Sequence, residues 1–584
     1  MMSSRPRLVA ALLLACTLPT LLAYNQPPSA TLLNQCVAVA LWGGVALVLA
    51  PTRWPQGTGW LLAALGLVLA GVAVSWAAGS LPLPLSLALQ AAGLLAGAAV
   101  MVVTGAAAAQ QGRGPATMAA LAIGLLAAGL LGSGVALVQV FAPNWTDGNL
   151  IAHSGVAGRA VGNLRQPNHL GSLLLWALAA VTLLAERGAL PRWAAWAGCA
   201  VMVLAIELTA SRTGAVGLGV LWLWALVDRR LSRQTRWLLA ALPLLYGLAY
   251  LSMGWWGSVS QQALGAGARL AAEGAASGSI ESPNSRLNIW RNALDLIAAN
   301  PWAGVGFGEF NLAWTLTPFP NRPTAFFDHT HNLALQLAVE LGLPAASAVL
   351  LLMATALWQA ARRAWRAEGE AGLAARTAWV LVVLTLLHSA VEYPLWYAYF
   401  LMPAALAWGF ALGTPPGPAR LPSSAANSAP QPAAAWALAA GLLMTLAGAF
   451  AVLDYQRVVV IYAPGDGAGT LGERIARGQR SLLFAHHADY AAATNDAPPA
   501  DAALGLARAT HSLLDTRLML AWARHLADNG QAQQVDQARW LARRLREFKN
   551  AEAESFFAPC VEGATDLFQC QPPQRAHSWR EFTQ

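Results

Sequence analysis

The sequence predicts an all-α protein that crosses a membrane many times and carries a large outer loop and a helical C-terminal region. Of its 584 residues, 57% are hydrophobic and 11% are charged, and the mean hydropathy is +0.47. This composition is typical of an integral membrane protein rather than a soluble domain. The apolar residues also gather in windows of about 20, the length that spans a bilayer as a helix. The lipid bilayer is therefore the first partner that the sequence predicts.

We expect about thirteen transmembrane helices within residues 1–453. The N-terminal window has the charged start of a cleavable signal, but no small-x-small site follows it, so we expect it to remain as the first span. The short pair on either side of Pro394 could instead be kinked or re-entrant. The windows are 8–23, 31–50, 60–78, 86–108, 117–140, 169–185, 193–209, 213–227, 237–253, 332–358, 378–391, 395–412 and 433–453.

The arginines predict the orientation of these spans. The loops on one side of the predicted bilayer contain Arg53, Arg113, Arg187, Arg192, Arg229, Arg230, Arg233, Arg236, Arg362, Arg363, Arg366 and Arg376. Positively charged loops mark the cytoplasmic side. The N-terminus and a Pro/Ser/Ala-rich linker at 414–432 are thus expected inside, and the loop 254–331 and residues 454–584 outside. The net charge of +8 is spread over short loops without a basic stripe, so we expect no nucleic-acid partner.

The outer loop contains one predicted amphipathic helix, near residues 285–299. Its apolar face is expected to contain Leu287, Trp290, Leu294 and Ile297. At about 100° per residue, Arg286 points into that face and needs a buried anion, whereas Arg291 lies on the polar face. The C-terminal residues 454–584 are polar and helical, with a pattern that suggests short helix pairs. Their Cys560 and Cys570 can close a disulfide if this region faces an oxidising compartment.

The most informative polar segment ends the outer loop, where Asp328, His329, Thr330, His331 and Asn332 precede an apolar helix. Ionisable groups at a membrane boundary are costly unless they are buried with partners or serve a reaction. A neutral imidazole can act as a general base, oriented by Asn or Asp. The same residues could ligate a metal, although no further Cys/His cluster completes such a site. They could also only cap the helix, through Asp328 or Thr330.

Four other polar segments are expected on the outer side. Arg212 and Arg286 can bind a phosphate through their guanidinium groups, although Arg212 could instead extend to lipid headgroups. Residues 165–168 (Arg165, Gln166, Pro167 and Asn168) can bind sugar hydroxyls or cap a helix. Glu392 and Tyr393 precede Pro394; an aromatic belt explains the tyrosine but not the carboxylate.

Taken together and in order, these segments resemble the O-antigen ligase and polymerase superfamily of bacterial inner-membrane proteins. The resemblance is closest to the pilin-type protein O-oligosaccharyltransferases, the PglL/PilO-like group. It covers roughly residues 155–410 and is carried by residues 162–168, 211–214, 285–290, 301–308, 329–332 and 388–396. One departure is the Gly342-Leu-Pro-Ala345 segment, where the ligase pattern expects a second Gly, Thr or Tyr. This departure weakens the interpretation as a lipopolysaccharide ligase.

The resemblance assigns roles to individual residues. It implies that His331 is the essential histidine of the large periplasmic loop and that Arg212 and Arg286 hold a lipid-linked pyrophosphate. It maps Gln166 and Tyr393 onto two further functional positions of the family. We group Arg165, Asn168, Asp328, His329, Asn332 and Glu392 with them as supporting or substrate-binding residues.

These roles imply a glycosyltransferase that is independent of metals and cofactors. The expected reaction moves an oligosaccharide from undecaprenyl pyrophosphate onto Ser or Thr of a periplasmic acceptor protein, with inversion at the anomeric carbon. The resemblance to the pilin-type group implies that this acceptor is a pilin. An O-antigen ligase or polymerase with a sugar acceptor is the alternative within the same chemistry. A lipid-linked glycan transporter or flippase is the alternative of another class. A transporter favours repeated halves and ionisable groups near the midplane, whereas here the polar groups cluster at one face.

Overall fold

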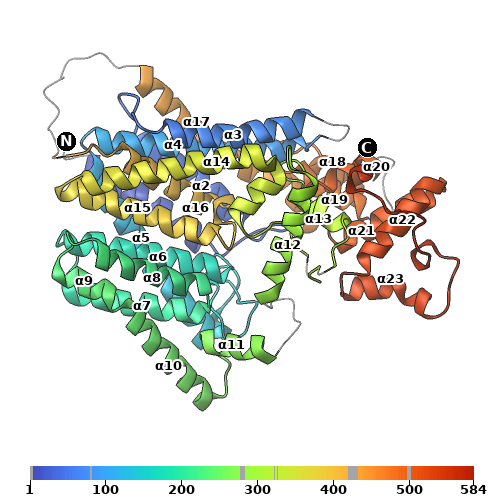
Figure 1. The fold of residues 1–584 in the computed structure, drawn as a ribbon, viewed down its shortest axis with the longest axis horizontal. Coiled ribbons are helices and arrows are strands. Elements are labelled where there is room, and N and C mark those ends of the chain that lie inside the picture. Colours follow the sequence, from blue (N-terminus) through green and yellow to red (C-terminus); the bar gives the residue numbers. More distant parts are fainter. Residues whose placement is uncertain are drawn as a thin grey trace. The chain divides into compact units, whose positions relative to one another are not determined.

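A computed structural model of the chain describes residues 4–78, 82–275, 283–320, 322–324, 326–417, 432–495 and 502–583 (Figure 1). These residues are helical, with loops and a single isolated β-bridge, and they contain no β-strand. The all-α prediction is therefore confirmed for the described part of the chain. The predicted linker at 414–432 lies mostly outside the described residues.

Nine helical stretches in the described ranges are long and apolar enough to cross a membrane. They are α3 (Gly59–Ala77), α4 (Leu85–Gln110), α5 (Gly114–Phe141), α6 (Pro167–Glu186), α7 (Arg192–Thr209), α9 (Arg233–Ala240) continued by α10 (Leu242–Ser260), α14 (Leu333–Arg366), α15 (Gly369–Ser389) and α17 (Pro432–Tyr462). Four shorter apolar helices lie at the other predicted spans: α1 (Ser4–Leu21), α2 (Leu32–Val48), α8 (Arg212–Val227) and α16 (Ala398–Gly413). The chain is thus a polytopic membrane protein, and thirteen crossings stay a prediction.

The remaining helices are short and belong to loops or to the C-terminal region. They are η1 (Pro143–Trp145), α11 (Gly265–Ala275), α12 (Pro283–Ala299), α13 (Phe310–Leu316), η2 (Pro394–Trp396), α18 (Leu471–Gly478), α19 (Ala485–Ala493), α20 (Ala502–Ala509), α21 (Thr516–Asp528), α22 (Ala532–Leu545), α23 (Ala551–Val561), η3 (Phe568–Cys570) and η4 (Trp579–Phe582). In the described part of the outer loop predicted at 254–331, α10 continues to Ser260 and is followed by α11, α12 and α13.

The chain divides into two compact units. Unit 1 comprises Met1–Leu65, Leu94–Ala275 and Leu351–Val452, and unit 2 comprises Gly66–Gly93, Ala276–Leu350 and Leu453–Gln584. Four of the five boundaries fall inside α3, α4, α14 and α17, and the fifth follows the end of α11. Unit 1 contains most of the apolar helices, whereas unit 2 contains the outer-loop helices α12 and α13 and the C-terminal helices.

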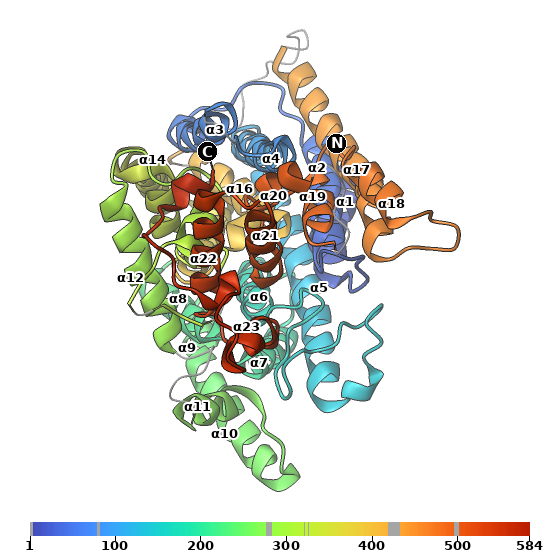
Figure 2. The same cartoon turned by 90° about the vertical axis from the view of Figure 1, so that its right-hand side faces the viewer.

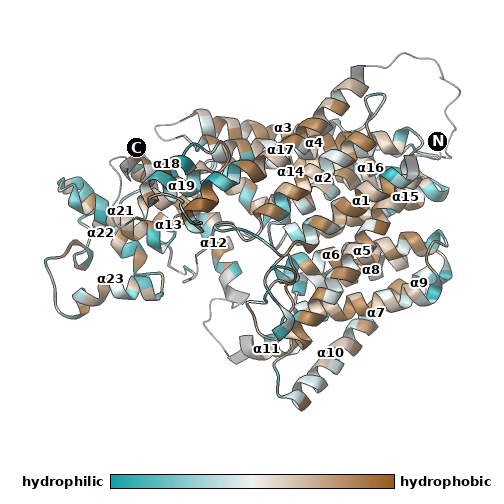
Figure 3. Cartoon of the chain, turned by 180° about the vertical axis from the view of Figure 1, so that it is seen from behind, coloured by the Kyte–Doolittle hydropathy of each residue, from teal (hydrophilic) through white to brown (hydrophobic). Residues whose placement is uncertain are grey.

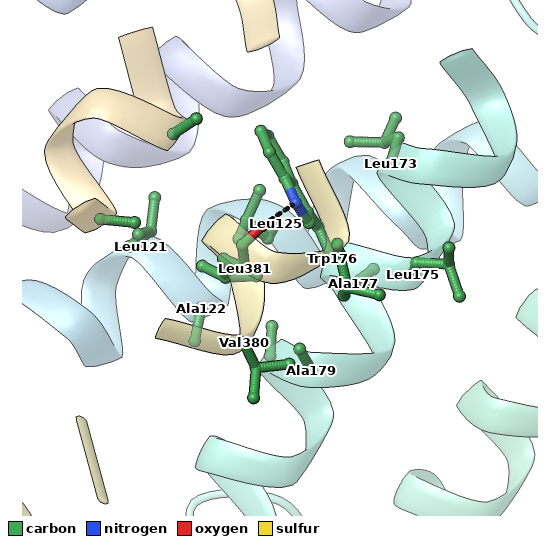
Figure 4. Packing of buried hydrophobic residues seen from close by; sticks show 14 of the residues in the cluster. Leu121, Ala122, Leu125, Leu173, Leu175, Trp176, Ala177, Ala179, Val380 and Leu381 are labelled. Atoms are coloured by element: carbon green, nitrogen blue, oxygen red, sulfur yellow. Dashed lines mark hydrogen bonds between the residues drawn. The ribbon is translucent and has the colours of Figure 1, made fainter. Parts of the chain in front are cut away.

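The core of unit 1 forms around α6, which packs against α5, α7, α8 and α15. Almost every residue of α6 is buried, as expected of a helix that is apolar all round. Figure 4 shows Trp176 of α6 among leucines of α5 and α15, with its indole N–H donating to the Leu381 carbonyl at 3.1 Å. That bond satisfies the one polar group of a buried tryptophan. The core holds the N-terminal end of α6, where several predicted site residues lie.

The C-terminal helices of unit 2 pack in short pairs. α18 packs on α19, α19 on α20, and α21 on α22 and α23 (Figure 2). Figure 3 shows that these helices and the loops have many hydrophilic residues, while the long helices are mainly hydrophobic. Cys560 and Cys570 are joined in a disulfide, with their Cα atoms 5.3 Å apart. The helix pairs that the sequence suggests are therefore present in this region.

The predicted span at 332–358 is not one continuous helix. α14 is interrupted at Gly342, whose φ of 77° and ψ of 164° are not helical. Three backbone bonds tie the flanking turns to residues 301–306: Val305 N–H to Val339 O at 2.8 Å, Gly306 N–H to Glu340 O at 3.0 Å and Leu343 N–H to Pro301 O at 2.8 Å. Glycine allows the positive φ, and Pro344 cannot continue the hydrogen-bond ladder through the break.

The predicted amphipathic helix is present as α12, but its buried face differs from the prediction. Leu287 and Leu294 are 48% and 54% exposed, whereas the buried side chains are Ile289, Asn292, Ala293, Leu296 and Ile297. The helical period alone could not separate these faces, because apolar residues occur on both. The packed face also contains a polar residue, Asn292, whose side-chain oxygen accepts a hydrogen bond from the Trp314 indole at 3.2 Å. A face with a buried amide does not follow from hydrophobic periodicity. Arg291 is exposed, as predicted.

Candidate functional site

His331 lies in the last turn before α14, in a backbone conformation that is rare for a residue with a side chain. Its φ is +54°, in the left-handed region. This conformation costs a non-glycine residue roughly 1–2 kcal/mol, and such strain is concentrated at functional positions. The His331 ring is half-buried and meets the edge of Phe327, with the ring centroids 5.5 Å apart. The loop thus holds the His331 imidazole against Phe327, and the strained backbone is the energetic cost of that placement.

Thr330, which precedes the strained residue, is fixed on several sides. Its N–H donates to the Gln336 side chain at 2.8 Å, and its carbonyl accepts from the Trp290 indole of α12 at 3.0 Å. Asn332 then caps α14, because its side-chain oxygen accepts from Leu335 N–H at 3.0 Å. The predicted helix start is correct, but the cap is Asn332 rather than Asp328 or Thr330. These bonds compensate for the strain at His331.

Asp328 and His329 form an ion pair beside His331, with Asp328 Oδ1 3.1 Å from His329 Nδ1. Partial burial opposes ionisation of the carboxyl, but the charges of His329 and His331 and the bond from His329 outweigh it. Together they lower the Asp328 pKa to about 2. The Asp328 carboxylate is therefore ionised at neutral pH. A negative charge next to an imidazole stabilises the imidazolium that forms when the ring accepts a proton.

Arg286 lies on α12, one helical turn before Trp290. Side chains four residues apart are neighbours on a helix surface. Because Trp290 contacts the backbone of Thr330, the turn of α12 that follows Arg286 lies next to the His331 loop within unit 2. Arg286 is half-buried, and its role as an anion ligand stays a prediction.

A second cluster lies in unit 1, where three of the predicted segments converge on Asn168. Its amide donates to Glu392 Oε1 at 2.9 Å and its oxygen accepts from the Ser211 hydroxyl at 2.7 Å. Ser211 also caps α8, accepting from Gly214 N–H at 3.1 Å. Asn168 therefore joins the start of α6, the start of α8 and the loop between α15 and α16.

Arg212 is the first residue of α8, directly after Ser211, and is exposed. An arginine at the N-terminus of a long helix adds its charge to backbone N–H groups that favour anions. Arg212 and Glu392 thus belong to one unit, and Arg286 and His331 to the other. Tyr393 stacks on Tyr397, with the ring centroids 6.1 Å apart.

Two other predicted residues serve the fold through the contacts they make. The Gln166 side chain caps α6 by accepting from His169 N–H at 2.8 Å. Arg165, with a φ of +55°, donates to the carbonyls of Ala23 at 2.9 Å and Gly148 at 3.4 Å. For residues 165–168 the sequence left two alternatives open, sugar binding and helix capping, and the contact of Gln166 is that of a helix cap.

Sequence reasoning missed a buried histidine network behind Asn168. His388 Nδ1 lies 2.8 Å from the Ser172 hydroxyl, and His169 Nδ1 lies 3.2 Å from the Tyr399 hydroxyl. The two imidazole rings meet edge to face at 5.8 Å. The sequence does contain a signal for them, because His169 and His388 are titratable residues inside the predicted spans 169–185 and 378–391.

In the ranges that the structure describes, no three His, Cys, Asp or Glu side chains lie together as a possible metal-ligand set. Asp328 and His329 instead pair with one another. The chemistry available to the His331 loop is proton transfer by imidazole next to a carboxylate.

The fold and these clusters define a polytopic helical membrane protein with polar groups gathered at the ends of apolar helices. Three family models match the chain: O-Antigen ligase over residues 197–350, the C-terminal part of a virulence factor membrane-bound polymerase over 376–556, and protein glycosylation ligase over 160–185. The chain is also 27% identical over 296 residues to a general O-oligosaccharyltransferase of Acinetobacter baylyi. That match covers 48% of this chain and about half, 47%, of the relative.

Over these ranges the chain is similar to O-antigen ligases and protein glycosylation ligases, and the three matches together support a likeness to that superfamily. The matched ranges include both polar clusters: Asn168 lies in the glycosylation-ligase range, and Arg212, Arg286 and His331 lie in the O-antigen-ligase range. The resemblance noted from the motifs is thereby confirmed at the level of the superfamily.

Proposed function

We propose that this protein is an O-oligosaccharyltransferase of the bacterial inner membrane. It moves an oligosaccharide from undecaprenyl pyrophosphate to Ser or Thr of a periplasmic protein of the pilin type. The observation that carries the proposal is the histidine held at φ +54° beside an ionised Asp328, in a chain similar to a general O-oligosaccharyltransferase. The N-terminus lies in the cytoplasm, and the His331 loop and residues 454–584 lie in the periplasm.

The proposed reaction is a single displacement at the anomeric carbon. The acceptor hydroxyl attacks that carbon while His331 takes the hydroxyl proton, a contribution typically worth 10²–10⁴-fold in rate. The bond from the anomeric carbon to the pyrophosphate oxygen breaks, and its electron pair leaves with undecaprenyl pyrophosphate. Arg286, which lies in the same unit as His331, stabilises the charge on that leaving group. The same role for Arg212 stays a prediction from the sequence. Attack from the opposite side inverts the anomeric configuration.

The test is a reconstitution of the purified protein with a lipid-linked oligosaccharide and one of two acceptors. A pilin-like peptide containing Ser and Thr is compared with a lipid A core oligosaccharide. Product on the peptide supports the proposal. Product on the core alone would replace it with the O-antigen ligase function, which the match over residues 197–350 favours. Movement of the lipid-linked glycan across vesicles, without transfer to any acceptor, would make the protein a flippase.

Two substitutions separate the histidines of the loop. His331→Ala is expected to lower the transfer rate by at least a hundredfold, since it removes the proposed base. His329→Ala is the comparison variant: His329 is paired with Asp328 and is a supporting residue with no proposed role in proton transfer, so a smaller loss of rate is expected. If His329→Ala abolished transfer and His331→Ala did not, the proposed base would be wrong.

A further inference from the structure

The C-terminal helices contact α13, which in turn contacts the loop that carries His331, all within unit 2. The turn between α20 and α21 supplies the first contact, since Leu514 N–H donates to the Asn311 side-chain oxygen at 2.8 Å. The same Asn311 donates its amide to the Phe327 carbonyl at 2.9 Å. Phe327 is the residue whose ring meets His331. One buried side chain thus stands between the C-terminal region and the His331 loop.

Other contacts fix α13 against the C-terminal region. His511, beside the same turn, is hydrogen-bonded to Glu309 at the start of α13. At the other end of the helix, the Trp540 indole of α22 donates to the Leu316 carbonyl at 3.3 Å. Both ends of α13 are therefore held by residues beyond 500, and Asn311 lies between them in a buried position.

We propose that the C-terminal helical region braces the His331 loop and that Asn311 is the positioning residue that connects them. The inference rests on the proposed function, because it gives a role to the loop geometry in the transfer reaction. Asn311 suits this task because an amide has both a donor and an acceptor, so it can bind an N–H group on one side and a carbonyl on the other. Neither partner is free to move without losing a buried bond.

The physical consequence is a loss of rate rather than of donor binding. The proposed pyrophosphate ligands do not include Asn311, so donor affinity is expected to persist when this side chain is changed. The imidazole, however, must lie within hydrogen-bond reach of the attacking hydroxyl, and a displacement of about 1 Å can cost on the order of a hundredfold. We expect Asn311→Ala to lower kcat by roughly 10- to 100-fold and to leave the KM for the lipid-linked donor within about twofold.

The matched control is Asn550→Ala. Asn550 also makes two side-chain hydrogen bonds, to Thr516 Oγ1 at 2.7 Å and from Ala553 N–H at 2.9 Å, but both lie within the C-terminal region. Its loss destabilises α23 without releasing the loop, so kcat is expected to stay near the native value. Equal kcat values for the two variants would overturn the proposal.

A readout that needs no substrate separates this inference from the proposed function. Hydrogen–deuterium exchange of residues 326–332 in the full-length protein is expected to rise in Asn311→Ala and not in Asn550→Ala. Unchanged exchange in Asn311→Ala would overturn the brace even if transfer is confirmed. Absence of transfer by the native protein would overturn the proposed function, while the exchange result would still decide the brace.

A second variant guards against misfolding of Asn311→Ala. Asn311→Asp keeps an acceptor for Leu514 N–H but cannot donate to the Phe327 carbonyl. It is expected to preserve protection of the 511–516 turn while raising exchange in the loop and lowering kcat. Protection lost equally in both segments, or in neither, would contradict the directional contact proposed for Asn311.

Discussion

Replacing Glu547 by glutamine tests how a buried cation is held beside α13. Arg322 is only 3% exposed in its side chain, and Glu547 lies 3.5 Å from its guanidinium group. The guanidinium lies over the rings of Trp314 at 4.1 Å and Phe548 at 4.7 Å. Burial lowers the Arg322 pKa to about 9, although the Glu547 carboxylate opposes that shift. The carboxylate therefore offsets part of the cost of a cation that burial disfavours.

The magnitude follows from the burial of the two partners. Breaking a fully buried ion pair by removing one partner costs about 3–5 kcal/mol. Glu547 is 29% exposed in its side chain, so solvent screening reduces this to roughly 2–3 kcal/mol. Arg322→Met removes the cation but keeps an apolar chain between the rings, and an apolar replacement of a buried charge is often close to neutral. We expect it to cost less than about 1.5 kcal/mol.

The double variant gives the decisive comparison. In the Arg322→Met background, Glu547→Gln is expected to cost about 1–2 kcal/mol less than in the native protein, because the stranded cation is gone. The remaining cost comes from Arg544, which lies 3.0 Å from the same carboxylate. The assay is the opening free energy of backbone amides in 310–316 and 540–545, measured by hydrogen exchange at neutral pH. Additive effects, or a cost of Glu547→Gln below about 1 kcal/mol, would refute this account of Arg322.

Three further predictions concern other parts of the molecule. Burial lowers the His487 pKa from 6.5 to about 4, so the folded protein keeps this imidazole neutral while the unfolded chain protonates it. Stability is therefore expected to fall by up to about 3 kcal/mol as the pH drops from 6.5 to 4, and His487→Gln should flatten the pH dependence of thermal unfolding. Gly342→Ala places a Cβ 2.4 Å from the Trp302 carbonyl oxygen at a φ of +77°, and it is expected to lower the free energy of unfolding by at least about 2 kcal/mol. The control is Gly247→Ala, whose Cβ meets no atom within 4 Å and should leave stability unchanged. Equal melting temperatures for the two variants would contradict this prediction. Asn168→Ala removes the hydrogen bond to Glu392 and is expected to slow glycan transfer about tenfold or more in the reconstituted assay, whereas an unchanged rate would limit this bond to a structural role.

The location of the helices was predictable from the sequence, because burial in a bilayer demands long apolar segments whatever their neighbours are. The polar segment that ends at His331 could be singled out as a candidate site from the sequence, since ionisable residues at a membrane boundary are rare without a purpose; its role in the reaction stays a prediction. The interruption of α14 was not predicted, although Gly342 and Pro344 are visible. Such residues permit a break, but the backbone bonds from 301–306 decide that it forms.

The sequence by itself determined the all-helical membrane class, the approximate span positions and the residue types that can bind an anion or accept a proton. Tertiary structure alone decided that Asn168 meets Glu392, 224 residues later, and that Asn311 connects Leu514 with Phe327. The physical reason is the distance along the chain over which each kind of information acts. Hydrophobic periodicity acts over one helix and can be read locally, whereas a polar side chain's partner depends on how distant segments pack.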